Sequence, residues 1–88
     1  MWIWEWRNKP LFVSSHALDE LRRLDLRMEK VIETLEQGYD CTTKDERNRE
    51  KLARCMKMKG KIYRVVLGTS YSTHYKCECW VLVHAKPD

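Results

Sequence analysis

The first residues of the chain alternate between apolar and polar side chains with a period of two. Trp2, Trp4 and Trp6 fall on one side of this alternation, which predicts a first strand that is interrupted before Pro10. Three tryptophans on one face form a large apolar surface. We interpret it as part of the core or as a homodimer contact, with a base-stacking platform for RNA as the third alternative.

Two stretches with helical spacing follow the first strand. The spacing of apolar residues predicts one helix over 15–24, capped by Ser14 or Ser15, and a second helix that Asp25 caps. Gly38 occupies the position that commonly follows the last turn of a helix. The apolar stripe of the second helix, which we expect to be buried against the sheet, consists of Met28, Val31, Ile32 and Leu35.

The second half of the chain has the pattern of a meander. Strands are predicted over 52–58 and 61–67 with a tight turn at Lys59-Gly60, and a last strand over 75–86. The polar stretch before them is irregular, and 47–54 forms either one further helical turn or the approach to a strand. The predicted order is β-α-α-β-β-β, in a single α+β domain over 1–88. Its sheet is expected to be antiparallel, with two helices packed on one face and the other face partly open.

Charge is distributed unevenly between the two halves. Residues 1–43 contain six Lys or Arg against eight Asp or Glu, and residues 44–88 contain eleven against five. A strand ribbon with cations between apolar residues suits a polyanion such as RNA. The alternative is a hairpin whose charges are merely solvated and discourage edge-to-edge aggregation. The candidate RNA-binding residues are Arg54, Lys57, Lys59 and Lys61.

Location and thiol state are inferred from the N-terminus. Glu5 lies where a signal peptide has its apolar centre, and no small-residue cleavage site follows, so we expect a cytoplasmic protein without a membrane span. In that compartment Cys41, Cys55, Cys77 and Cys79 are expected to be reduced, with Cys77 and Cys79 buried and free of metal. A zinc site formed by the last two with Cys41, Cys55 or His74 is the weaker alternative.

Several of these segments resemble the RelE-like toxin superfamily. The resemblance rests on the SSHALDELRR helix, the short helix ending at Gly38, and the strands GKIYRVVL and CWVLVHAK, and it covers roughly 14–86. The most similar members are small and uncharacterised, with a Ser-His-Ala helix and a Tyr-Arg-Val-Val strand. Many members of the superfamily cut RNA, often mRNA on the ribosome, and are inhibited by an antitoxin protein. Others have no demonstrated activity.

RNA cleavage without a metal requires a base, an acid and a cation that stabilises the phosphorane. The candidates are His84 and His16 for proton transfer and Arg64 for phosphate. We place His84 on the strand face of Trp80 and Leu82, from which it could approach Arg64. Each candidate also has a structural interpretation: solvated histidines, and an Arg64 ion pair with a helix carboxylate such as Glu33 or Glu36.

Two functions of different class follow from these residues. The first is a metal-independent endoribonuclease without a cofactor, acting as the toxin of a toxin–antitoxin module. The second is a non-catalytic module of the same fold that binds RNA or a protein through the basic hairpin. A zinc-stabilised domain is a third, weaker interpretation.

Overall fold

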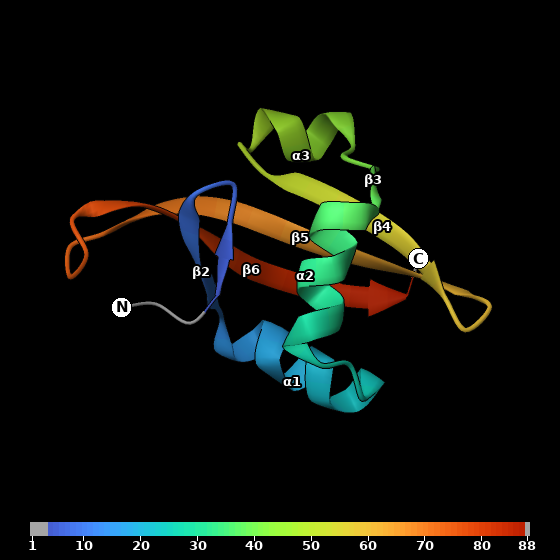
Figure 1. Ribbon diagram of the computed structural model, residues 1–88. Coiled ribbons are helices and arrows are strands. Elements are labelled where there is room, and N and C mark those ends of the chain that lie inside the picture. The colour runs from blue at the N-terminus through green and yellow to red at the C-terminus, as the bar shows by residue number, and fades with distance from the viewer. Residues whose placement is uncertain (1–3, 88) are drawn as a thin grey trace.

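The computed structural model describes residues 4–87 of the chain. It is an α+β fold in which three helices accompany a six-stranded, mixed and curled sheet of order β1-β2-β6-β5-β4-β3 (Figure 1). None of the helices within these residues is long and apolar enough to cross a bilayer. The elements are β1 (Glu5–Trp6), β2 (Lys9–Val13), α1 (Ser15–Leu24), α2 (Met28–Gln37), β3 (Tyr39–Asp40), α3 (Lys44–Asn48), β4 (Leu52–Met58), β5 (Lys61–Ser72) and β6 (Cys77–Pro87).

The expectation of a purely antiparallel sheet is wrong. Strands β4, β5 and β6 form the predicted antiparallel meander, which β3 extends at one edge. However, β2 lies parallel to β6, with Leu11 opposite Trp80 and Val13 opposite Leu82. An alternating pattern identifies a strand and its buried face but carries no information on direction. Direction depends on the long connection through the helices, which permits parallel pairing.

The expected first strand is a hairpin instead. Arg7 and Asn8 both have positive φ, 49° and 62°, and they form the two-residue turn between β1 and β2. Pro10, expected to interrupt the strand, lies within β2. Trp6 is buried and Trp4 packs against the core, as the core interpretation predicts. Trp2 lies outside the described residues, and a homodimer through this segment stays a prediction.

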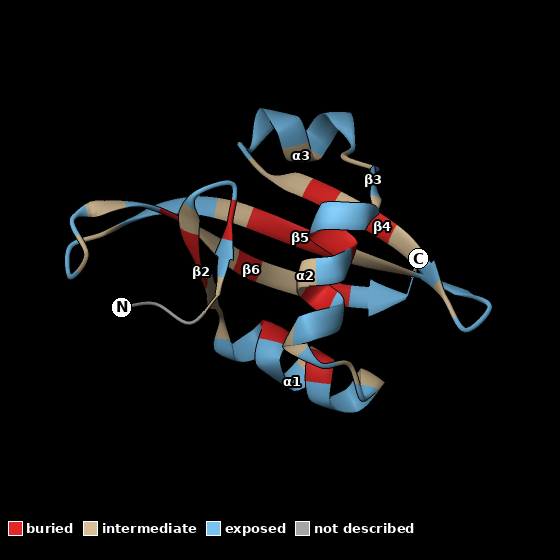
Figure 2. Ribbon diagram, in the orientation of Figure 1, coloured by how far each residue is buried: buried red, intermediate tan, exposed pale blue. Residues whose placement is uncertain are grey.

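The two longer helices are confirmed, although one cap is wrong. The Ser14 hydroxyl accepts a hydrogen bond from the backbone N–H of Ala17 and begins α1. Asp25 does not cap α2; it ends α1 in a left-handed conformation with φ 52°. On α2, Val31 and Leu35 are fully buried, while Met28 and Ile32 are partly buried at the margin of the core. Figure 2 shows this buried face of α2 turned toward the sheet.

Gly38 ends α2 as predicted, but a left-handed conformation is not the reason. Its φ is −78°, and a Cβ atom there would overlap the carbonyl oxygens of Thr34 and Cys55. The residue therefore lets the end of the helix approach β4 closely. Beyond it, the stretch expected to be irregular contains β3 and α3. α3 begins with a capping box in which Thr43 and Glu46 bond each other's backbone N–H groups.

A bulge in β6 changes which side chains share a face. Val66 pairs with His84 and Leu67 pairs with Leu82, so Val83 is an extra residue on β6. Leu82 and Ala85 consequently both lie in the core although they are three residues apart. His84 lies on the opposite face from Leu82, which corrects the shared face expected from simple alternation.

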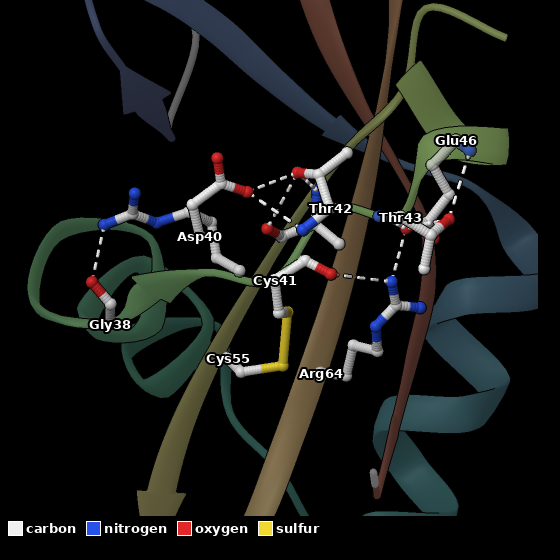
Figure 3. Close-up of a disulfide and its surroundings, with 10 residues drawn as sticks. Gly38, Asp40, Cys41, Thr42, Thr43, Glu46, Cys55 and Arg64 are labelled. Atoms are coloured by element: carbon white, nitrogen blue, oxygen red, sulfur yellow. Dashed lines mark hydrogen bonds and ion pairs between the residues drawn. A yellow bond between two sulfur atoms is a disulfide. The ribbon is translucent and has the colours of Figure 1, made fainter. Parts of the chain in front are cut away.

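The face of the sheet away from α2 is covered near β3 and is not open there. Ala53, Cys55 and Val66 are buried but do not belong to the core cluster that packs under the helices. The segment that leads into α3 lies over this end and is fixed to β4 by a disulfide between Cys41 and Cys55 (Figure 3). The expected open face is therefore covered at the β3–β4 side of the sheet.

Candidate functional site

Three of the four predicted RNA-binding cations gather at the turn between β4 and β5. Lys59 and Gly60 form a two-residue turn in which both residues have positive φ, 51° and 79°, which confirms the predicted hairpin. Lys57, Lys59 and Lys61 are all exposed. None of their ammonium groups forms an ion pair or a hydrogen bond with another residue of the described chain.

The end of β6 adds a fourth cation to this turn. Pro87 lies in a shallow groove together with Gly60 and Ile62, so β6 ends against the hairpin turn. Lys86 pairs across the sheet with Arg64 and is exposed, also without a side-chain partner among residues 4–87. We define the lysine end as Lys57, Lys59, Lys61 and Lys86.

Arg54 does not belong to the lysine end. Its Nη2 donates a 2.7 Å hydrogen bond to the carbonyl of Gly38, and its Nε is buried without a partner. The guanidinium therefore connects the C-terminal end of α2 to β4. Arg54 also lies on the opposite face of β4 from Lys57, because it pairs with the buried Val65 whereas Lys57 pairs with the exposed Ile62.

Arg64, the predicted phosphate-binding cation, has partners on the segment before α3 and within it. Its Nη2 donates to the carbonyl of Cys41 at 3.2 Å and forms an ion pair with Glu46, and only 13% of its side chain is exposed (Figure 3). Burial acts to raise the pKa of the Glu46 carboxyl, but hydrogen bonds from Thr43 and Arg64 outweigh it and hold that pKa below its usual range. The structural interpretation of Arg64 is right in kind, with Glu46 as the partner in place of Glu33 or Glu36.

The structure brings the two predicted histidines together around a carboxylate. His84 Nδ1 lies 3.3 Å and His16 Nε2 lies 3.6 Å from the same Oε1 atom of Glu20, and the imidazole centroids are 5.0 Å apart. Glu20 is missing from the sequence-based candidates. Its spacing of four residues from His16 on a predicted helix was the available signal, because such residues lie on one face. We call these three residues the histidine cluster.

The position of Glu20 follows from the edge of the sheet. β2 pairs with β6 only as far as Leu82, which leaves the backbone N–H of Ala85 without a strand partner. Glu20 Oε1 accepts a 3.1 Å hydrogen bond from this N–H, and 18% of the side chain is exposed. A cavity of about 140 Å³ adjoins the carboxylate, lined by Glu20, Arg23, Leu24, Ala85, Lys86 and Pro87.

The histidine cluster has two chemical capacities. Two imidazoles can donate and accept protons on a phosphodiester. Their shared partner Glu20 lines a cavity whose wall also includes the cations Arg23 and Lys86. The same nitrogen and oxygen atoms all lie within 4.8 Å of one another, which is a donor set that a divalent metal ion could use. Arg64 belongs to neither arrangement, because its guanidinium is engaged by Glu46.

The expectation that all four cysteines are reduced is wrong for two of them. Cys41 and Cys55 form a disulfide because β3 pairs with β4, which brings their Cα atoms to 6.1 Å. The pair is therefore not free to join a zinc site. Cys77 is half-buried and Cys79 is buried, both as free thiols, and burial raises the pKa of the Cys79 thiol.

No protein-family model matches the chain, and no curated protein or solved structure is significantly similar to it.

Proposed function

We propose that this protein binds RNA through the lysine end. The observation that carries the proposal is the set of four exposed ammonium groups at one end of the sheet, without acidic partners among residues 4–87. Unpaired cations can neutralise the phosphates of a nucleic acid, and the release of the condensed counterions from its backbone drives association.

The surroundings of the turn favour a nucleic acid over a simple anion. A cavity of about 280 Å³ opens beside Lys59, with Lys30 and Tyr63 among the residues of its wall. Apolar and aromatic walls next to cations suit single-stranded RNA, since bases stack on such surfaces while phosphates bind the ammonium groups. The remaining residues of the cavity wall are Leu24, Asp25, Leu26 and Met58.

The test compares the RNA affinity of a variant that lacks the three hairpin charges with that of a variant that lacks three positive charges elsewhere. The variant Lys57→Gln, Lys59→Asn, Lys61→Gln should bind single-stranded RNA on the order of 10–100-fold more weakly at ~0.1 M salt. Asparagine is used at Lys59 because it tolerates positive φ. The control, Lys44→Gln, Lys51→Gln, Lys76→Asn, removes the same net charge, and its asparagine also replaces a positive-φ lysine. Equal weakening in both variants would reduce the proposal to non-specific attraction by net charge.

A second candidate function is cleavage of the bound RNA, favoured by the pairing of His16 with His84. One imidazole would take the proton of the 2′-hydroxyl and the other would protonate the leaving 5′-oxygen, with no metal involved. Arg23 and Lys86, on the wall of the adjoining cavity, would stabilise the phosphorane in place of Arg64. The resemblance to RelE-like toxins adds a ribosomal substrate and an antitoxin partner to this candidate.

Cleavage and binding are separated by incubating the pure protein with RNA, and with ribosomes and mRNA, in the presence of EDTA. His16→Asn and His84→Asn should abolish cleavage and leave most of the RNA affinity, because their contribution is made in the transition state. His74→Asn is the matched control. Absence of cleavage in every context would leave the binding module as the function.

A further inference from the structure

The geometry points to a divalent transition-metal site formed by His16, Glu20 and His84. The three residues come from α1 and β6, two elements that are far apart in the sequence and lie next to each other in the fold. The carboxylate oxygen of Glu20 lies between the two imidazoles, 3.6 Å from His16 Nε2 and 3.3 Å from His84 Nδ1. This inference is independent of RNA binding at the lysine end.

The distances are close to those of an assembled site. Ligands about 2.0–2.2 Å from a tetrahedral zinc ion lie roughly 3.4 Å from one another. Two donor pairs of the histidine cluster are already near that separation, and all three donor atoms lie within 4.8 Å of one another. The His16 side chain is 64% exposed, so a change of rotamer can adjust its nitrogen without disturbing the core.

The donor set selects the class of ion. Two imidazoles and one carboxylate suit Zn²⁺, Co²⁺, Ni²⁺ or Cu²⁺, whereas Mg²⁺ and Ca²⁺ prefer oxygen ligands and Cu⁺ prefers sulfur. Three protein ligands leave the fourth position open, and the exposure of His16 and His84 gives solvent access to it. The backbone N–H of Ala85 holds the Glu20 carboxylate in place, as a supporting hydrogen bond does at metal sites.

Occupation of this site would have two consequences. A metal ion would join α1 to the edge of β6 and raise the unfolding temperature as its concentration rises above its dissociation constant. It would also occupy both imidazoles, so the ion would inhibit RNA cleavage by His16 and His84 while leaving RNA binding by the three hairpin lysines unchanged. Arg23 and Lys86 line the cavity beside Glu20, and their charge opposes the ion and limits its affinity.

The experiment titrates the metal-free full chain with Co²⁺ and with Zn²⁺, following Co²⁺ absorption and the heat of Zn²⁺ binding. We expect one ion per chain. His16→Ala, Glu20→Gln and His84→Ala should each weaken binding by at least the roughly 10–100-fold that removal of a supporting hydrogen bond costs. His74→Ala, which alters the remaining histidine of the chain, should bind as the wild type does. Because His16 is exposed, its variant should keep the fold, which circular dichroism checks.

Three results would overturn the site. The first is no saturable binding of either ion to the wild type. The second is binding that survives His16→Ala and His84→Ala. The third is a sulfur-to-cobalt charge-transfer band that disappears in Cys77→Ser, which would place the ion on the free thiols. RNA affinity is measured separately, so failure here leaves the lysine end untouched.

Discussion

The arginines of segment 39–54 and the lysines of the hairpin turn come from the same basic half of the chain, yet the arginines alone have partners. Arg47 pairs with Asp40 at 3.7 Å, Arg49 pairs with Asp45 at 3.4 Å, and Arg54 is bound to a backbone carbonyl. The lysine end has no such partners within the described chain. Local charge density alone therefore does not identify a candidate binding surface. The proposal for the lysine end rests on unpaired cations that also gather at one turn.

This contrast between paired and unpaired cations also predicts which region contributes to stability and which to the proposed RNA binding. Around Arg64, the disulfide, the capping box and the Glu46 ion pair fix one segment to the sheet. At the lysine end the cations contribute little to folding, because exposed charges without partners gain nothing from the native state. Substitutions should accordingly affect the free energy of unfolding in one region and RNA affinity in the other.

The largest expected effect on the free energy of unfolding is that of breaking the disulfide. Reduction removes a cross-link between residues 14 apart in the sequence and should lower the free energy of unfolding by about 3 kcal/mol. Urea unfolding with and without reductant measures it. A Cys41→Ala, Cys55→Ala variant should be insensitive to reductant, and a wild-type midpoint that ignores reductant would show that the two thiols are not joined.

A smaller effect is expected from Arg64. Arg64→Gln leaves the Glu46 carboxylate without its charged partner at a site where little of either side chain is exposed, and it should cost about 2 kcal/mol of unfolding free energy. Lys61→Gln, three residues earlier on the same strand, should change it by less than about 0.5 kcal/mol. Equal costs for the two variants would abolish the distinction between paired and unpaired cations.

The pH dependence of stability sharpens the same contrast. The pKa of Glu46 is held below its ordinary value of 4.5, so the ion pair stabilises fully above that value and its effect disappears as the pH falls through the lowered pKa. The urea midpoint of the wild type should therefore fall between pH 5 and roughly pH 3. Glu46→Gln should show a shallower fall, and Asp45→Asn, at an exposed pair, should follow the wild type. A Glu46→Gln profile as steep as that of the wild type would contradict the role of this ion pair.

The smallest expected effect is on the stability of the lysine variant itself. The triple substitution at Lys57, Lys59 and Lys61 should shift the unfolding midpoint no more than the control triple does, because none of the three is paired within residues 4–87. Matched thermal melts check this. A clear loss of stability would mean that the lysines help to hold the hairpin, and that the weaker RNA binding of the variant has a structural cause.

The features predicted correctly from the sequence are local. The helix over 15–24, the helix that ends at Gly38 and the turn at Lys59-Gly60 follow from spacing, caps and turn residues of the segments themselves. The capping box of Thr43 and Glu46 is equally local, and its Thr-x-x-Glu spacing is a sufficient signal for α3 that the sequence interpretation missed.

The features that were wrong depend on register between distant segments. The parallel β2–β6 pair, the Cys41–Cys55 disulfide and the bulge at Val83 require knowledge of which residues face each other across strands. The arrangement of the candidate site could not be predicted for the same reason. His16 and His84 are recognisable singly, but their meeting on Glu20 needs the docking of α1 on β6, and the separation of Arg64 from the site needs α3.

The salt dependence of RNA affinity tests the central claim most directly. For the wild type, the logarithm of the binding constant should fall linearly with the logarithm of salt concentration. The triple variant at Lys57, Lys59 and Lys61 should flatten that slope by about 0.7 for each phosphate that is no longer neutralised, or roughly 2 in all. The control variant at Lys44, Lys51 and Lys76 should keep the wild-type slope. A wild-type slope retained by the hairpin variant would contradict the account, because the unpaired lysines would then not bind the RNA.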